Sequence, residues 1–155
     1  MKETVISLSQ SATEGVFRDA RKVSADKLDW QPMEIGRSVL DQLQELSQSP
    51  TWVTYLLKER SMKDFSDETM AAYEARRRQF TTLDACEEEC LKNHAEMVEA
   101  IRAFPDADLG TTISMPFGPK PDWPILDVMT LHMWNCHYHQ GQINYIRWLA
   151  GDEGF

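Results

Sequence analysis

Apolar residues recur every three or four positions along most of the chain, and this spacing predicts helices rather than strands. Proline and glycine are scarce and are grouped between the periodic stretches. Four long helices and a short charged one are expected, at about Thr4 to Lys22, Ser38 to Leu57, Asp67 to Gln79, Leu83 to Phe104, and from just after Asp122 to Leu149.

Local signals mark several helix ends. Suitable N-cap residues precede three of the helices: Ser38, Thr81 or Thr82, and Asp122. Gly151 is expected to end the last helix. Pro50 is expected to kink the second helix or to restart it, since proline cannot donate the helical hydrogen bond. Residues 109–121 are rich in proline and glycine and are predicted to form a loop, with at most a short extended piece.

The length and composition indicate one domain. A chain of 155 residues with 42% hydrophobic residues buries a sufficient core without disulfides, so we expect a single domain over residues 1–155. Four helices of about 20 residues with a cross-connection define an all-α, four-helix bundle. Ligand and metal sites in such bundles are built from inward side chains, which directs attention to the polar residues on the apolar helix faces.

The charge excludes two classes of partner. A net charge of -9 repels phosphate backbones and anionic membrane surfaces, so neither nucleic acid nor a membrane is expected as a partner. Arg76, Arg77 and Arg78 form a basic run in this acidic chain and are predicted to be a solvated face. The three cysteines are an odd number and no secretory segment precedes them, which favours a reduced, cytoplasmic setting.

The last helix carries the densest set of coordinating side chains. At 100° per residue, His132, Cys136 and His139 share one apolar stripe, with Asn135 about 60° from His132. His132 and His139 are about 10 Å apart along the axis, too far for one ion without a ligand between them. The spacing leaves three alternatives open: Asn135 with His139, His132 with Cys136 and His139, or two histidines held in a core or cleft by hydrogen bonds.

Two other stripes bear on packing and assembly. The helix expected from Leu83 carries Cys86, Cys90 and His94 on an otherwise apolar stripe, and core packing is the expected role of that stripe. The other side of the last helix carries an aromatic stripe with a glycine: Trp134, Tyr138, Gly141, Tyr145 and Trp148. This stripe suits either the bundle interior or a homodimer face, with Trp134 expected inside and Trp148 left open.

These residues carry a family resemblance. The segment from His139 to Ile146, His-Gln-Gly-Gln-Ile-Asn-Tyr-Ile, resembles the His-x-Gly-Gln-Ile motif on the last helix of the DinB/YfiT-like superfamily. Leu28 to Pro32 and the helix that follows Arg37 are similar to that superfamily's Trp-x-Pro turn and second helix. The likeness spans about residues 5 to 150, and the last-helix motif is its specific part.

The resemblance implies a four-helix bundle, often dimeric, that binds a divalent metal through three histidines. Transferred to this chain, the ligands are Glu45, Asn135 and His139, so two of the three histidines are replaced by oxygen ligands. Such a set favours Mn, Mg or Ca over the Zn or Ni that three imidazoles attract, and complete loss of the metal is the alternative. Glu45 lies about 120° from the apolar stripe of its helix, at the flank unless a cleft opens there.

Two functions remain open from the sequence. In the first, a metal-dependent enzyme such as a thiol transferase uses His139 as ligand or general base, with His132 and Gln142 contacting a small-molecule substrate or a small thiol. Elemental analysis with Mn, Ni and Zn would test it. In the second, a metal-free, non-catalytic bundle acts through homodimerisation or by binding a small ligand.

Overall fold

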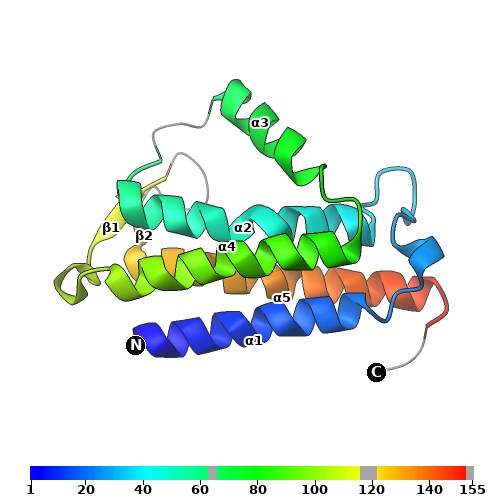
Figure 1. Ribbon diagram of the computed structural model, residues 1–155, viewed down its shortest axis with the longest axis horizontal. Coiled ribbons are helices and arrows are strands. Elements are labelled where there is room, and N and C mark those ends of the chain that lie inside the picture. The colour runs from blue at the N-terminus through cyan, green and yellow to red at the C-terminus, as the bar shows by residue number, and fades with distance from the viewer. Residues whose placement is uncertain (63–65, 116–121, 153–155) are drawn as a thin grey trace.

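Four long helices form the bundle, as the hydrophobic pattern predicts. In a computed structural model that describes residues 1–62, 66–115 and 122–152, α2 packs against α4 and α5, while α1 packs against α5 and α4 (Figure 1). The long helices are α1 (Lys2–Ala20), α2 (Val39–Glu59), α4 (Leu83–Ala103) and α5 (Ile125–Leu149). None of the described helices is both long and apolar enough to cross a membrane.

A fifth helix, α3 (Asp67–Arg77), lies outside the bundle. It is inclined to α2 and stands above it in the view of Figure 1. Its first turn is capped by Ser66, whose hydroxyl accepts from the backbone N–H of Thr69, and it carries acidic residues there, as the helix dipole favours. This helix roofs a cavity on the bundle surface, described below.

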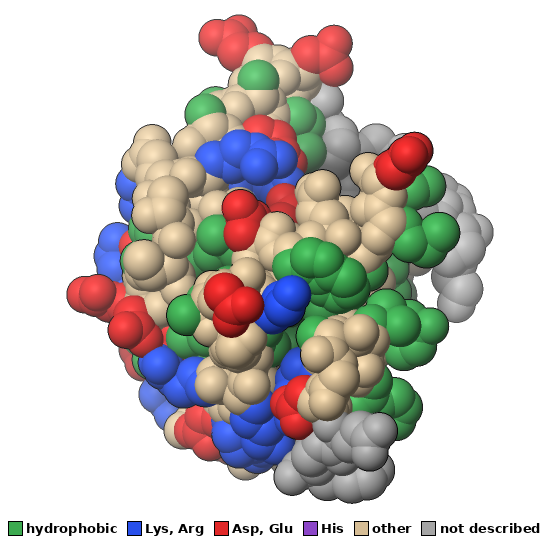
Figure 2. Space-filling model, turned by 90° about the vertical axis from the view of Figure 1, so that its right-hand side faces the viewer, with side chains coloured by type: hydrophobic (Ala, Val, Ile, Leu, Met, Phe, Trp, Pro, Cys, Tyr) green, Lys and Arg blue, Asp and Glu red, His purple; other side chains and the backbone are tan. Residues whose placement is uncertain are grey.

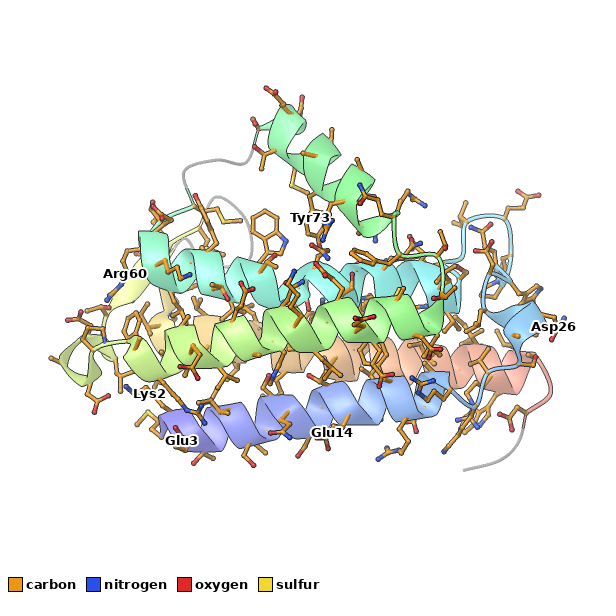
Figure 3. All side chains as sticks on the ribbon, viewed as in Figure 1. Lys2, Glu3, Glu14, Asp26, Arg60 and Tyr73 are labelled. Carbon is orange, nitrogen blue, oxygen red and sulfur yellow. The ribbon has the colours of Figure 1, made fainter. Side chains whose placement is uncertain are left out.

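Several helix ends follow the local signals. Ser38 and Thr82 accept from backbone N–H groups three residues on, and each caps its helix. Gly151 follows Ala150, the C-cap of α5, and adopts a φ of 90°, which favours glycine. At the other end, Lys2 ties α1 to α4 by donating to the carbonyls of Arg102 and Phe104 (Figure 3).

One local prediction is wrong, and one of the two alternatives for another is excluded. Asp122 does not cap α5, because residues Asp122–Pro124 form a strand (β2) that pairs antiparallel with Thr112–Ser114 (β1), and the helix begins at Ile125. Of the two alternatives for Pro50, a kink or a restart, the restart is excluded, because α2 runs through Pro50. The carbonyl of Leu46 that Pro50 leaves without a helical donor accepts from the Cys90 thiol at 3.3 Å. Residues 116–121 of the predicted loop lie outside the described residues.

The short helical turns Ala25–Lys27 and Asp106–Asp108 complete the described elements. The stripe on α4 is core, as expected, and its cysteines are buried and free.

A buried polar layer crosses the middle of the bundle. It separates two apolar clusters, and each long helix contributes one member: Ser9 from α1, Ser49 from α2, His94 from α4 and His132 from α5. Ser9 hydrogen-bonds His94 at 3.1 Å, Ser49 hydrogen-bonds His132 at 2.5 Å, and the two imidazole rings lie 5.6 Å apart. Because buried polar groups are costly unless paired, this layer favours one register of the four helices.

Candidate functional site

The structure brings Glu45, Asn135 and His139 together, although Glu45 belongs to α2 and the other two to α5. His139 Nε2 lies 3.2 Å from Glu45 Oε1, and the Asn135 amide nitrogen lies 3.4 Å from that same oxygen. The His139 side chain is buried, whereas 29% of the Glu45 side chain is exposed. The flank position expected for Glu45 is therefore the edge of a cavity.

Two glutamines orient the His139 ring. The Oε1 atoms of Gln42 and Gln142 lie 3.1 Å and 3.0 Å from Nδ1, and a carbonyl oxygen only accepts, so Nδ1 carries a proton and donates. In the neutral ring, Nε2 then has a lone pair that faces a carboxylate oxygen. Only a proton or a metal cation between Nε2 and Glu45 Oε1 makes that contact favourable.

Arginines occupy the other side of the Glu45 carboxylate. Arg37 lies 2.7 Å and Arg77 lies 3.9 Å from Oε2. Burial alone would raise the pKa of Glu45, but the hydrogen bond and charge of His139, together with the charge of Arg37, outweigh it and lower the pKa to about 2. Glu45 is therefore a carboxylate throughout the neutral range.

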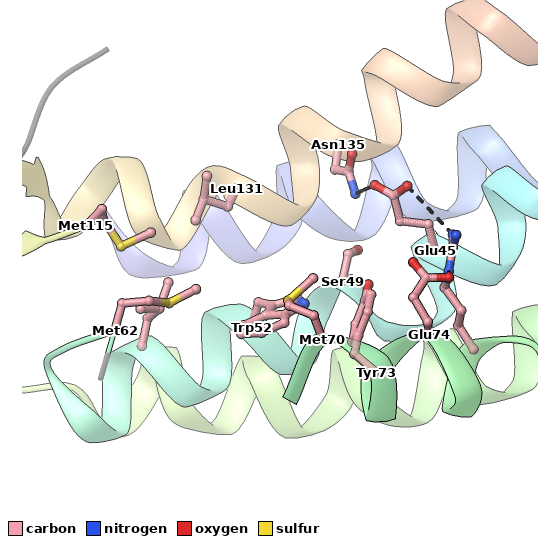
Figure 4. Close-up of a pocket in the computed structure, with 12 residues that line it drawn as sticks. Glu45, Ser49, Trp52, Met62, Met70, Tyr73, Glu74, Met115, Leu131 and Asn135 are labelled. Carbon is pink, nitrogen blue, oxygen red and sulfur yellow. Dashed lines mark hydrogen bonds and ion pairs between the residues drawn. The ribbon is translucent and has the colours of Figure 1, made fainter. Parts of the chain in front are cut away.

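A cavity of about 320 Å³ opens beside this cluster, between α2, α3 and α5 (Figure 4). Glu45, Asn135 and Arg77 form its polar end. Its apolar walls come from aromatic, methionine and leucine side chains, namely Trp52, Leu56, Met62, Met70, Tyr73, Met115 and Leu131. Thioether side chains adapt to differently shaped guests, so this cavity suits a small molecule with an apolar part.

His132 and Gln142, the two residues predicted to contact a cofactor, lie on different sides of the site. Gln142 touches His139 and lines a second cavity of about 430 Å³ on the outer side of α5. His132 sits in the core, where Nδ1 accepts from the Ser49 hydroxyl and Nε2 donates to Thr13 Oγ1, 3.0 Å away. Burial, with the nearby His94, lowers the pKa of His132 to about 3, so its ring is neutral. The contact of His132 with a cofactor stays a prediction. Its hydrogen-bond partner Ser49 lines the cavity beside Glu45, and His132 is connected to that cavity through Ser49.

The alternative cluster of His132, Cys136 and His139 does not form. His132 and Cys136 are neighbours, with Nε2 and Sγ 3.5 Å apart, but the nitrogens of His139 face Glu45 and the glutamines. Among the described residues, no three His, Cys, Asp or Glu side chains come together in a way that could hold an ion. A metal centre at Glu45 and His139 would therefore need an amide or water oxygen as a further ligand.

A family model of the DinB superfamily matches residues 7–143, which is most of the chain. The chain belongs to the DinB superfamily. No curated protein matches it. The three positions where the resemblance expects ligands are the three that this DinB fold brings together.

Two solved structures share this DinB fold. YfiT from Bacillus subtilis, described as a probable metal-dependent hydrolase with an unusual four-helix bundle topology, is 16% identical, with a TM-score of 0.77 over 97% of this chain and 87% of that protein. YjoA, a DinB-like protein from Bacillus subtilis, is 18% identical, with a TM-score of 0.64 over 95% of this chain and 92% of that one. At these identities the likeness shows the fold alone.

Arg77 and Tyr73 of α3 were missed as site residues. The expectation of a solvated arginine run is wrong for Arg77, whose side chain is 9% exposed and pairs with Asp41, Glu45 and Glu74. Tyr73 lies between α3 and α2, and its ring is 5.4 Å from that of Trp52 (Figure 3). The spacing of Met70, Tyr73 and Arg77 places them on one face of a helix. This shared face was the feature of the sequence that could have indicated their place in the site.

Proposed function

We propose that this DinB-family protein is a divalent-metal-dependent enzyme acting on a small molecule with an apolar part, which binds in the cavity beside Glu45. One observation carries the proposal: His139 Nε2 and Glu45 Oε1 face each other at 3.2 Å while Nδ1 is held by amide oxygens. Two ligand atoms of one ion, each about 2.1 Å from it, lie about 3 Å apart.

The residues present fit an ion with a preference for oxygen. His139 Nε2 and Glu45 Oε1 would hold it, and Asn135 would add its amide oxygen after rotation of the side-chain amide. The hydrogen bonds from His139 Nδ1 to the glutamines are the outer support that metal-bound histidines usually have. Arg37 and Arg77 reduce the negative charge of the centre, which weakens the binding of any divalent cation there.

When bound, the metal would supply a positive charge that lowers the pKa of a bound water or thiol, and a small thiol is the co-substrate class that the resemblance implies. The chain itself orients the guest and excludes water from it. Trp52 and Tyr73 form an aromatic wall of the cavity. Burial raises the pKa of Tyr73 to about 12, so its phenol stays protonated at neutral pH and keeps its hydrogen-bond donor.

The test is metal binding to the purified protein, measured by elemental analysis and by calorimetric titration with Mn, Ni and Zn. Stoichiometric binding is expected in the unmodified protein, loss of it in His139→Ala, and weaker binding in Asn135→Ala. His137→Ala is the matched control, since His137 is exposed two residues away on the same helix. If none of the three ions binds, the metal-dependent enzyme is excluded.

A second candidate is favoured by the arginines on Glu45. With Arg37 at 2.7 Å and Arg77 at 3.9 Å from Oε2, the negative charge of the carboxylate is already compensated, and the same cavity would then bind a small guest without metal or catalysis. This candidate predicts no thiol conjugation to chlorodinitrobenzene with or without metal. Conjugation that requires Mn and is lost in Glu45→Gln would instead favour the enzyme.

A further inference from the structure

The cavity beside Glu45 is long and narrow. Four of its lining residues follow one face of α2, namely Glu45, Ser49, Trp52 and Leu56. From the first to the last of them the helix rises about 16 Å, at about 1.5 Å per residue. Met62, just after the helix, extends the lining further. A volume of about 320 Å³ over this length leaves a cross-section of about 20 Å², which suits one unbranched chain.

The polarity of the cavity changes along its length. Glu45, Asn135 and Arg77 lie at one end. Figure 4 shows Met62 and Met115 at the opposite end, with the apolar walls between the two ends. Apolar groups gain free energy on leaving water, whereas polar groups need partners. A guest therefore places an apolar tail toward the methionines and a polar head beside Glu45.

The charges at the polar end already pair with one another. Arg77 lies 2.8 Å from Glu74 and 3.9 Å from Glu45, and Arg37 lies 2.7 Å from Glu45. Figure 2 shows basic side chains gathered beside acidic ones just below the top of the molecule, where α3 meets the bundle. A carboxylate head would meet two carboxylates there, and an ammonium head would meet the buried Arg77 guanidinium. The polar end therefore favours a neutral head.

Tyr73 supplies a hydrogen-bond donor for such a head. The Trp52 indole donates to the Tyr73 hydroxyl, and burial raises the pKa of Tyr73 to about 12, so the phenol keeps its proton. Within the described part of the chain, no residue accepts that proton. The Glu45 oxygens are already engaged by Arg37 and Asn135. A carbonyl group accepts and does not donate, so it matches this end of the cavity.

We propose that the cavity binds an unbranched, medium-chain carbonyl compound, with its oxygen on Tyr73 and its tail between Trp52 and the methionines. A methylene group is about as large as a water molecule, whose share of liquid volume is about 30 Å³, so 320 Å³ holds about 11 non-hydrogen atoms. In a methyl ketone this leaves a tail of about eight carbons. This substrate class rests on the cavity of the proposed function and not on its metal.

Binding of methyl ketones to the metal-free protein tests the proposal. Equilibrium dialysis with EDTA gives the dissociation constants for tails of about 4, 6, 8, 10 and 12 carbons. Each added methylene should tighten binding about fourfold, up to about eight carbons, because its burial is favourable, and longer tails should gain nothing. The fatty acid and the primary amine with the same tail should bind about tenfold more weakly, since a charged head disturbs an ion pair.

Two pairs of variants locate the head and the tail. Tyr73→Phe should weaken the binding of every ketone about fivefold, the value of one hydrogen bond, without changing the gain per methylene. Tyr55→Phe is the matched control, since Tyr55 contacts the other side of Trp52 and lines a different cavity. Met62→Trp should fill the far end and move the limit to a shorter tail. Leu91→Trp on α4, where Leu91 is 49% exposed, should leave that limit in place.

Tryptophan fluorescence tests whether the guest lies beside Trp52. Trp134 was expected in the interior, and this is wrong, because its side chain is 62% exposed and its ring stacks on Tyr138 outside the bundle at 5.4 Å. The fluorescence change caused by the ketone with a tail of about eight carbons should be lost in Trp52→Phe and kept in Trp134→Phe. Dialysis of the same two variants measures how much ketone each one binds.

Several results would overturn the proposal. These are no binding of any ketone, an affinity that ignores tail length or still rises beyond about ten carbons, and tighter binding of the fatty acid or the amine. Equal binding by Tyr73→Phe and Tyr55→Phe would overturn it too, as would an unchanged limit in Met62→Trp that circular dichroism shows to be folded. Failure of the protein to bind Mn, Ni or Zn would exclude the proposed enzyme and leave the ketone series unaffected.

Discussion

His132 and His139 occupy the same buried stripe of α5, two turns apart, and the rest of the bundle gives them different properties. His132 meets hydroxyl groups of α1 and α2, is neutral, and belongs to the polar layer in the core. His139 meets a carboxylate and two glutamines at the edge of a cavity, with arginines behind the carboxylate. Burial alone does not make a histidine a site residue; a charged partner next to open space does.

The largest expected difference appears on replacing each ring with leucine. His139→Leu leaves the buried Gln42 without its partner and Glu45 Oε1 with Asn135 alone, so we expect a loss of about 2 to 3 kcal/mol in unfolding free energy and loss of metal binding. His132→Leu should cost only about 1 kcal/mol and keep the metal, because Thr13 already donates to the Ser9 carbonyl and Ser49 has the Leu46 carbonyl at 3.2 Å.

Urea denaturation and manganese titration of the two variants provide the measurement. Equal losses of stability, or loss of manganese binding in His132→Leu, would contradict the division between a core and a site histidine.

The pH dependence should separate the same two regions. The pKa of His132 is lowered from 6.5 to about 3, so its stabilising effect is complete above pH 6.5 and decreases as pH falls toward 3. The pKa of Glu45 is about 2, so its effect is complete above its unfolded value of about 4.3 and decreases only below that. Between pH 7 and pH 5, therefore, the contribution of His132 should fall while the Glu45 carboxylate stays ionised.

Unfolding free energies at pH 7 and pH 5 measure this separation. The stability of the unmodified protein relative to His132→Leu should fall by about 2 kcal/mol, at about 1.4 kcal/mol per pH unit below 6.5, so the variant should be the more stable of the two at pH 5. The Glu45 carboxylate itself stays ionised over that range. Burial also lowers the pKa of His94, a residue that both proteins contain. A constant difference for His132→Leu would show that its ring is not held neutral.

The smallest expected effect concerns how α3 is held over the cavity. Arg77→Met removes ion pairs with Asp41 and Glu74 and should cost about 1 kcal/mol, with faster hydrogen exchange along α3. Arg78→Met is the matched control, since the Arg78 side chain is 63% exposed and its ion pairs are long, and it should change stability by less than about 0.5 kcal/mol. Similar exchange rates in the two variants would show that Arg77 does not hold the helix.

The local predictions succeeded where nearby residues decide the outcome. The cap residues Ser38 and Thr82 and the end of α5 at Gly151 were confirmed, because a cap or a left-handed turn involves residues within a few positions. Asp122 does not cap α5, because its segment forms a β-strand that pairs with Thr112–Ser114. Pro50 does not restart α2, and the Cys90 thiol of another helix satisfies the carbonyl that the proline leaves without a donor.

The sequence by itself determined the all-α bundle, the buried stripes of α4 and α5, and, through the family resemblance, the three positions of the candidate site. Helical periodicity is a local property, and the apolar stripes must be buried against one another. Only the tertiary structure decided that Glu45 faces a cavity, that Arg77 is buried against it and that Trp134 is exposed. These three outcomes depend on how α2, α3 and α5 lie relative to one another, and contacts between distant segments leave no periodic trace in any one of them.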